Sequence, residues 1–378
     1  MGTWLSEDAY AASLAGLPGL RPGRLRRLIG LGNGVPSDAW RIVAEGRMPA
    51  DAYAREVRSR WRAGVRDPAP AEVIERYRRT GVRVLVPGMG GYPKRLAEDP
   101  EAPAVLFAAG NLEALDGPTV GVVGTRSATG YGRDVAATFG RRLARAGVAV
   151  VSGLAAGIDV AAHRGVLSAG AEGTPPVAVV GTGIDVVYPV SSAPVWEGVR
   201  RAGVIVSEAP LGAPASAWRF PYRNRIMAAL SDVVVVVESH EKGGALITAG
   251  LAADRGRAVM AVPGPVTSAA SGGSNSLIAD GCLIARDVTD VLVCVGLAGG
   301  GVPAGGAHSG AGRKTRPRPT PEDRQVLAAI DPAPTTLEQV MVRTGRSPGE
   351  LVLALDRLAD TGWVRSGAGW WERLCPAA

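Results

Sequence analysis

The sequence is poor in several residue types, and each shortage excludes a class of protein. It has three histidines and three cysteines, Cys282, Cys294 and Cys375, in 378 residues. No CxxC pair and no metal-site spacing occurs, so we expect neither a disulfide framework nor a metal. The longest apolar runs, such as residues 291–297, are far shorter than the ~20 residues that cross a bilayer, and the start lacks the basic segment of a secretory signal. We therefore expect a cytoplasmic protein with no membrane partner.

Lysine is scarce as well, so arginine carries nearly all of the positive charge. Residues 1–80 have 14 basic and 9 acidic side chains, residues 81–312 have 18 of each, residues 313–319 add four basic ones, and residues 320–378 have 6 basic and 8 acidic. Residues 81–312 therefore have no net charge, and the +7 of the whole chain comes from the segments on either side. A polyanion bound to residues 81–312 would have to be held by locally placed groups.

Residues 1–80 predict a small helical domain of the sterile-alpha-motif or helix-hairpin-helix kind. The segment LPGLRPGRLRRLIGLG places leucines at near-helical spacing between glycine turns. Its four arginines are Arg21, Arg24, Arg26 and Arg27. They suit either contact with a nucleic-acid backbone or a solvated helix face, and the sequence leaves both interpretations open.

Residues 81–298 predict a doubly wound α/β domain of the extended Rossmann type with a parallel sheet. After a proline-containing segment with two short β-type runs, β-type and helical patterns alternate regularly. Several β-type runs consist almost entirely of Val, Ile and Ala, which is typical of parallel strands covered on both faces. The predicted strands are residues 120–124, 148–152, 177–181, 204–207, 233–238 and 258–262.

The last part of the chain predicts a linker and a third domain. Residues 299–319 are rich in glycine and then in proline and arginine, which indicates a flexible basic linker. Residues 320–378 show helical patterns at 321–330, 336–344 and 347–360, followed by a two-stranded pattern at 362–372. This order is typical of a winged helix.

The most informative stretch is TVGVVGTRSATGYGRD at residues 119–134, a β-type run, a glycine-rich loop and the start of a helix. Such a loop leaves backbone N–H groups pointing at one spot, which attracts anions, and Arg126 adds a planar cation. Five similar loops follow before residue 282. Loops that leave parallel strands share one edge of the sheet, so we expect a single groove that binds phosphates. The candidate binding residues are Gly124, Arg126, Ser127, Thr129, Gly153, Gly157, Arg219, Phe220, Arg223, Asn224, Arg225, Lys242, Gly243, Gly244, Thr248, Gly273, Ser274 and Asn275.

The longest of these loops contains Phe220, Arg223 and Arg225. The two arginines lie two positions apart on the expected first turn of a helix, so their side chains diverge and cannot hold the same phosphate. We expect one of them to face the groove and the other to be structural. Phe220 either stacks on bases or packs on the core as an anchor of the loop.

Common nucleotide-dependent chemistries do not match the sequence. There is no GxxxxGK[ST] string, which disfavours ATP hydrolysis. Gly181 and Gly183 follow a predicted strand and Glu208 follows the next, but the third glycine of a dinucleotide fingerprint is missing. Asp159, Asp185 and Glu208 are single members of separate loops, so nothing marks an acid/base pair. We expect Asp159 to cap or orient its own helix. We expect no cofactor and no catalytic residue.

The motifs in order resemble the DNA-processing protein A family (DprA, also called Smf). They are VGTRSATGYG, SGLAAGIDVAAH, GTGIDVVYP, SEAPLG, FPYRNRIMAALS, GGALITAGLAADRGR, AVPGP and GSNSLIADG. The resemblance implies a non-enzymatic, homodimeric protein that binds single-stranded DNA in natural transformation and loads the recombinase RecA onto it. It also implies that Arg126 contacts a phosphate, with residues 220–225 beside it.

Two alternative functions remain from the sequence. Related Rossmann proteins of the lysine-decarboxylase-like family cleave nucleoside monophosphates with a PGGxGTxxE motif, but the nearest string here, residues 242–248, lacks the glutamate. A winged-helix regulator that senses a phosphate ligand is the other alternative. Its recognition helix at 347–360 would carry Glu350, Asp356 and Asp360 against Arg357 alone, which suits a phosphate-lined groove poorly. We expect that domain to contact protein or to cap the partner subunit instead.

Overall fold

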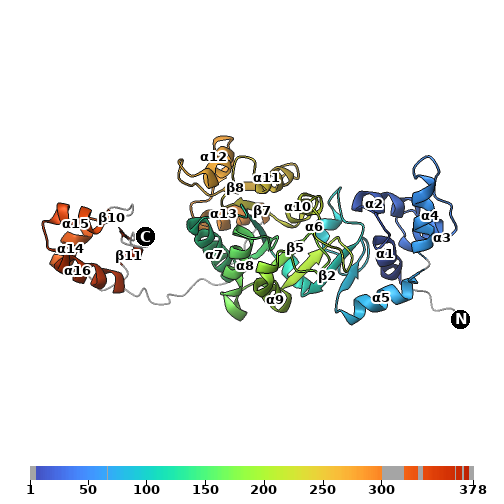
Figure 1. Cartoon of the computed structure of the whole chain (residues 1–378), viewed down its shortest axis with the longest axis horizontal. Coiled ribbons are helices and arrows are strands. Elements are labelled where there is room, and N and C mark those ends of the chain that lie inside the picture. Colours follow the sequence, from blue (N-terminus) through green and yellow to red (C-terminus); the bar gives the residue numbers. More distant parts are fainter. Residues whose placement is uncertain are drawn as a thin grey trace. The chain divides into compact units, whose positions relative to one another are not determined.

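The computed structural model describes residues 6–65, 67–299, 319–330, 335–361, 363–367 and 370–373. The chain divides into two compact units, Met1–Gly305 and Gly306–Ala378 (Figure 1). Cys375 and nearly all of the predicted linker lie outside the described residues.

The first unit is built on a nine-stranded sheet of order β1-β2-β6-β5-β4-β3-β7-β8-β9. From β6 to β9 all neighbouring strands are parallel, whereas β2 pairs antiparallel with both β1 and β6. The strands are β1 (Arg83–Leu85), β2 (Leu106–Gly110), β3 (Thr119–Val123), β4 (Ala149–Ser152), β5 (Val177–Val180), β6 (Val204–Ser207), β7 (Val233–Val236), β8 (Ala258–Ala261) and β9 (Leu283–Ile284). The predicted α/β fold is confirmed, and the six predicted strands are β3 to β8.

Alternate residues of the central strands face two different helical layers. Val233 and Val235 of β7 pack in the same cluster as α7, α8 and α13, whereas Val234 and Val236 pack with α10 and α11. All four side chains are fully buried, which explains the uninterrupted valine run. The helices are α6 (Lys94–Ala97), α7 (Gly130–Arg145), α8 (Ile158–Leu167), α9 (Ala193–Ala202), α10 (Arg219–Leu230), α11 (Gly244–Ala253), α12 (Gly272–Ala279) and α13 (Val288–Gly299), with short 3-10 turns η1 (Leu112–Leu115), η2 (Gly170–Glu172), η3 (Val190–Ser192) and η4 (Ala269–Ser271).

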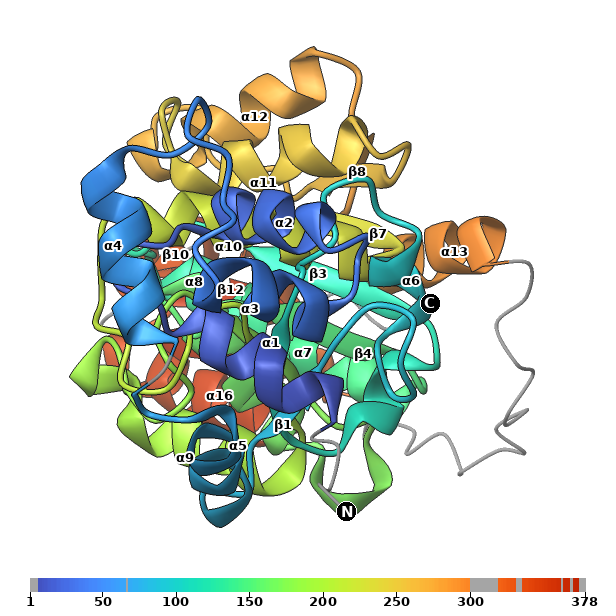
Figure 2. The ribbon, with the colours of Figure 1, turned by 90° about the vertical axis from the view of Figure 1, so that its right-hand side faces the viewer.

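Five short helices precede the sheet and pack at its β1 end. They are α1 (Glu7–Ala15), α2 (Pro22–Leu31), α3 (Pro36–Ala44), α4 (Arg55–Gly64) and α5 (Pro70–Arg79) (Figure 2). Their buried side chains belong to the same apolar cluster as Phe107 of β2 and Ile205 of β6, and the Tyr77 ring stacks on Phe107 at 5.0 Å between centroids. The helical segment therefore shares its core with the sheet.

The second unit contains α14 (Pro321–Ala328), α15 (Leu337–Thr344) and α16 (Pro348–Asp360) and a three-stranded sheet of β10 (Thr335–Thr336), β11 (Val364–Gly367) and β12 (Trp370–Arg373), in the order β10-β12-β11. Val326, Val340, Leu351 and Leu355 form its core. Three helices followed by a two-stranded wing confirm the winged helix. Arg357 on α16 is paired with Asp323 of α14 at 2.7 Å.

Within the described ranges, every helix is too short or too polar to cross a membrane.

Candidate nucleic-acid interface

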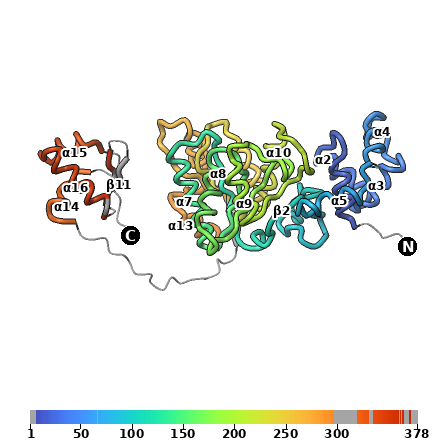
Figure 3. The backbone as a smooth tube through the Cα atoms, turned by 60° about the horizontal axis from the view of Figure 1, so that its bottom comes forward, coloured from blue at the N-terminus to red at the C-terminus, as the bar shows by residue number. Residues whose placement is uncertain are grey.

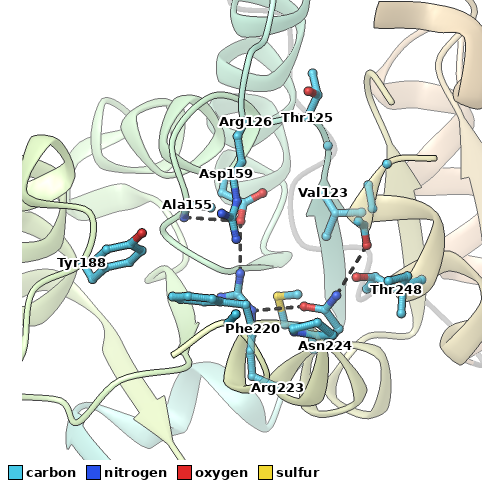
Figure 4. A pocket seen from close by; sticks show the side chains of 18 of the residues that line it. Val123, Thr125, Arg126, Ala155, Asp159, Tyr188, Phe220, Arg223, Asn224 and Thr248 are labelled. Carbon is cyan, nitrogen blue, oxygen red and sulfur yellow. Dashed lines mark hydrogen bonds and ion pairs between the residues drawn. The ribbon is translucent and has the colours of Figure 1, made fainter. Parts of the chain in front are cut away.

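A crevice opens at the carboxyl edge of the sheet where successive strands stop being added on one side of β3 and begin to be added on the other. β3 and β7 are neighbours, with Val120 opposite Val233. The strands β4 to β6 follow on the β3 side, and β8 and β9 on the β7 side. Loops that leave two such strands diverge and create a crevice. A cavity of about 590 Å³ lies there, lined by the loops after β3 and β4 and by the first turns of α10 and α11 (Figure 4).

The loop after β3 is held by its neighbours and presents Arg126. A Cβ atom on Gly124 would lie 2.4 Å from Ile158 Cγ1 and 2.8 Å from the carbonyl oxygen of Glu238, so this turn needs glycine. Thr129 donates from its N–H (3.0 Å) and its hydroxyl (2.5 Å) to the buried Glu238 carboxylate, and its hydroxyl caps α7. Arg126 is exposed, and its guanidinium has no hydrogen bond or ion pair among the described residues.

Arg126 lies over an aromatic pair. Its guanidinium carbon is 5.1 Å from the centroid of the Phe220 ring, and Phe220 is stacked on Tyr188 with centroids 5.2 Å apart. A smaller cavity of about 170 Å³ adjoins these rings on the side of the β5 loop. A cation beside accessible rings can bind a phosphate and a base at neighbouring positions.

Arg223 is a buried cation in the wall of the main cavity. Its guanidinium donates to the carbonyl oxygens of Gly153 (2.7 Å) and Val179, and it lies 3.7 Å from the carboxylate of Asp159. Burial raises the pKa of Asp159, while Arg223 and the N–H groups of Gly153 and Ala155 oppose that rise. Burial also lowers the pKa of His163, behind this pair, to about 4. His163 is therefore neutral near pH 7 and adds no charge to the site.

The two arginines of α10 diverge, as the spacing predicts. Arg225 turns away from the cavity, donates to the carbonyl oxygen of Glu101 at 2.7 Å and pairs with Glu208 at 2.5 Å. Arg223 reaches the cavity, but its N–H groups are used by the protein itself. Asn224 accepts a hydrogen bond from Arg223 at 3.1 Å and lies beside Gly244 of α11.

The structure brings some of the predicted residues to the two cavities and leaves others elsewhere. Those that line the main cavity are Gly124, Arg126, Phe220, Arg223, Asn224, Gly243, Gly244 and Thr248. Gly153 lines the adjoining cavity. Ser127, Thr129, Gly157, Arg219, Arg225, Lys242, Gly273, Ser274 and Asn275 line neither.

The predicted residues away from the cavities mostly hold the loops in place. Asn275 exchanges hydrogen bonds with the backbone of Gly264 at 3.0 and 3.1 Å, and Ser274 is fully buried. Gly157 has φ +83°, and a Cβ there would lie 2.3 Å from the carbonyl oxygen of Thr125. These residues fix the conformation of the loops at the carboxyl edge without lining either cavity.

The sequence patterns did not single out Tyr188 or Asp159 for this site. Tyr188 follows the Gly181–Gly183 turn in the loop after β5. Its position in the sequence was therefore enough to place it on the same edge of the sheet. The sequence indicates Asp159 only as a residue that orients its own helix. Its contacts with Gly153 and Ala155 fit that role, but its pairing with Arg223 depends on a contact between distant segments.

The fold is that of a Rossmann-type protein, with a doubly wound sheet, glycine-lined loops on its carboxyl edge and a C-terminal winged helix. The profile of DNA recombination-mediator protein A matches residues 83–296, and that of the DprA winged helix domain matches residues 312–366. The chain belongs to the DNA recombination-mediator protein A family, as the motifs predict.

Curated relatives and solved structures agree with this assignment. The chain is 29% identical to Protein Smf of Synechocystis over 96% of this chain and 98% of the relative. It is 35% identical to DNA processing protein DprA of Bacillus subtilis over 68% and 84%. The X-ray structure of DprA from Streptococcus pneumoniae superposes with a TM-score of 0.65 at 28% identity, covering 77% of this chain and 98% of that one. DprA from Helicobacter pylori, described for its single-stranded DNA binding mode, gives 0.51 at 27% identity, covering 56% and 94%.

Proposed function

We propose that this protein is a DNA-processing protein that binds single-stranded DNA along the carboxyl edge of its sheet during transformation and recombination. The observation that carries the proposal is Arg126, an exposed cation with no hydrogen bond or ion pair among the described residues, where α10 and α11 begin around one cavity. Helix N-termini and a free guanidinium both attract phosphate. The single-stranded DNA binding described for the Helicobacter pylori relative supports this ligand.

The aromatic pair favours a single strand over a duplex. Phe220 is half-buried and Tyr188 is 42% exposed, so a base can reach the rings only if it is unpaired and turned out of a helix. Bases in a duplex are stacked inside it and present only their edges in the grooves.

Competition between single-stranded and double-stranded DNA tests this function. A labelled oligonucleotide of about 20 nucleotides bound to the full chain is displaced by unlabelled single strand or duplex of the same sequence, at about 50 and about 200 mM salt. We expect the single strand to compete at least about tenfold better, which is the effect of one stacked base at about 1.4 kcal/mol. Equal competition by the duplex would contradict the proposal.

We propose that binding proceeds without cleavage. Asp159 is the one acidic side chain among the described residues that line the main cavity, and it is engaged by Arg223; Glu238, which holds the β3 loop, is engaged by Thr129. Neither is poised as a general acid or base toward the cavity. Oligonucleotide recovered from the complex should be intact, and released bases would favour the nucleotide-cleaving alternative.

We further propose that the protein acts as a homodimer that loads RecA, as the family resemblance implies. The measurement for the first part is the mass of the full chain in solution, where a monomer at micromolar concentration would contradict it. The measurement for the second is RecA filament formation on protein-coated single strands with and without this chain, where equal rates would contradict it.

A further inference from the structure

A second and larger cavity lies between the N-terminal helices and α10. It has a volume of about 1120 Å³ and is lined by residues 15–25 and Arg27 on one side and by the β6–α10 loop and the first turn of α10 on the other. Figures 2 and 3 show α2 beside α10. We call this cavity the α2–α10 groove and define it by Arg21, Arg24, Arg27, Trp218, Arg219 and Tyr222.

The α2 wall of the groove is positively charged. Arg21, Arg24 and Arg27 are exposed, and their spacing of three follows one side of the helix. None of the three guanidinium groups has a hydrogen bond or ion pair with a described residue. Arg26 lies on a different side and donates to the carbonyl oxygen of Pro100 at 3.3 Å. Arginines without a hydrogen bond or ion pair to the described residues are available to an anionic ligand.

The only acidic side chain that lines the described part of the groove is Glu208, and it is already neutralised. Its carboxylate is 2.5 Å from Arg225, and both side chains are less than a tenth exposed. The groove therefore keeps an excess of positive charge from α2 and Arg219. An anionic partner would enter it without meeting an unpaired carboxylate.

The opposite wall carries aromatic rings among these cations. The Trp218 ring lies 5.2 Å from the guanidinium carbon of Arg21 and 4.8 Å from that of Arg219. Tyr222 packs edge-on against Trp218 at 6.3 Å. Arginines interleaved with aromatic side chains bind the phosphates and the bases of one strand together, whereas an acidic peptide would use the charges alone.

The groove continues from the site described above. Trp218 and Arg219 come directly before Phe220 in the chain, so the first turn of α10 contributes to both cavities. A narrow pocket lined by Pro22, Trp218, Arg219 and Arg223 lies between them. A strand that leaves Phe220 can cross this turn and reach α2.

We propose that the α2–α10 groove binds the continuation of the single-stranded DNA held at Arg126. This inference rests on the proposed function, and it extends the footprint of the strand onto the N-terminal helices. Short oligonucleotides occupy the Arg126 site alone, and longer ones also occupy the groove.

The test compares two variants of the full chain on two lengths of oligothymidylate, about 8 and about 30 nucleotides. The first variant is Arg24→Ala/Arg27→Ala. The matched control is Arg55→Ala/Arg60→Ala on α4, which removes the same charge from exposed arginines of the same helical segment outside the groove. The affinity of each protein is measured across a series of salt concentrations.

We expect Arg24→Ala/Arg27→Ala to weaken binding of the longer oligonucleotide about 25-fold at about 0.1 M salt and to flatten its salt slope by about 1.4, since each lost phosphate contact on a single strand removes about 0.7. Binding of the shorter one should match the control. Equal behaviour of the two variants on the longer oligonucleotide would overturn the inference. If the parent chain binds neither length, the proposed function itself fails.

Discussion

Substituting Gly157 with alanine is expected to weaken single-stranded DNA binding by at least about fivefold at about 0.1 M salt, equivalent to the lost phosphate contact of Arg126. Gly157 has φ +83° and ψ −124°, a conformation that residues with a Cβ rarely adopt. The added Cβ would lie 2.3 Å from the carbonyl oxygen of Thr125 and 2.6 Å from that of Arg126. Both atoms belong to the backbone, so the loop that carries Arg126 has to move. We also expect a stability loss of about 2 to 5 kcal/mol from backbone strain and overpacking.

The control for this variant is Gly147→Ala. Gly147 has a similar φ of +81°, but a Cβ added there would meet no atom of the described residues within 4 Å, and it follows α7 at the opposite end of β4. It should lose stability through the unfavourable φ alone, about 1 to 2 kcal/mol, and keep its DNA affinity. Fluorescence anisotropy and urea denaturation measure the two effects. If Gly157→Ala binds as well as Gly147→Ala, the loop is not held as described.

The second large effect is expected for Arg223→Met, which removes the buried cation from the cavity wall. The carboxylate of Asp159 and the carbonyl oxygens of Gly153 and Val179 would lose their shared donor. Breaking a buried pair by removing one partner is destabilising by about 3 to 5 kcal/mol. Urea denaturation of the full chain measures this loss as the change in the free energy of unfolding of the first unit. Arg200→Met, in an exposed pair with Glu197, is the control and should leave stability nearly unchanged.

The loss in Arg223→Met should shrink as the pH falls. Burial already raises the pKa of Asp159, and removing the guanidinium that opposes this rise raises it further. An acid whose folded-state pKa exceeds its unfolded value destabilises the fold when it is ionised. This penalty decreases as the pH falls below the folded pKa and is gone below the unfolded pKa. The double variant Arg223→Met/Asp159→Asn should recover part of the stability at neutral pH. A loss that does not depend on pH, with no recovery in the double variant, would contradict the account.

The sequence was sufficient for the parallel part of the sheet and for placing its loops along one edge. Runs such as the four valines of β7 have a strong local signal, and the loops that follow parallel strands meet at one edge whatever the details of packing. The sequence does not place β1 and β9 in the sheet because they have only three and two residues. It does not place β2 there because the antiparallel pairing of β2 with β6 joins segments about a hundred residues apart.

The partners of individual side chains were harder to predict from the sequence. The spacing predicts that Arg223 and Arg225 diverge. Only the fold shows that Arg225 forms an ion pair with Glu208 and that Arg223 reaches the cavity. In the same way, Ser274 and Asn275 are residue types that often bind ligands, but here their side chains form hydrogen bonds with the backbone of their own loop. The groove between α2 and α10 required tertiary contacts that no local pattern encodes.

The most direct test of the central claim is the salt dependence of single-stranded DNA affinity for the parent chain and for Arg126→Ala. If Arg126 neutralises one phosphate at the carboxyl edge, the slope of log K against log salt should fall by about 0.7, and the affinity at about 0.1 M salt should fall about fivefold. An identical slope in the two proteins would show that the strand is bound elsewhere on the chain.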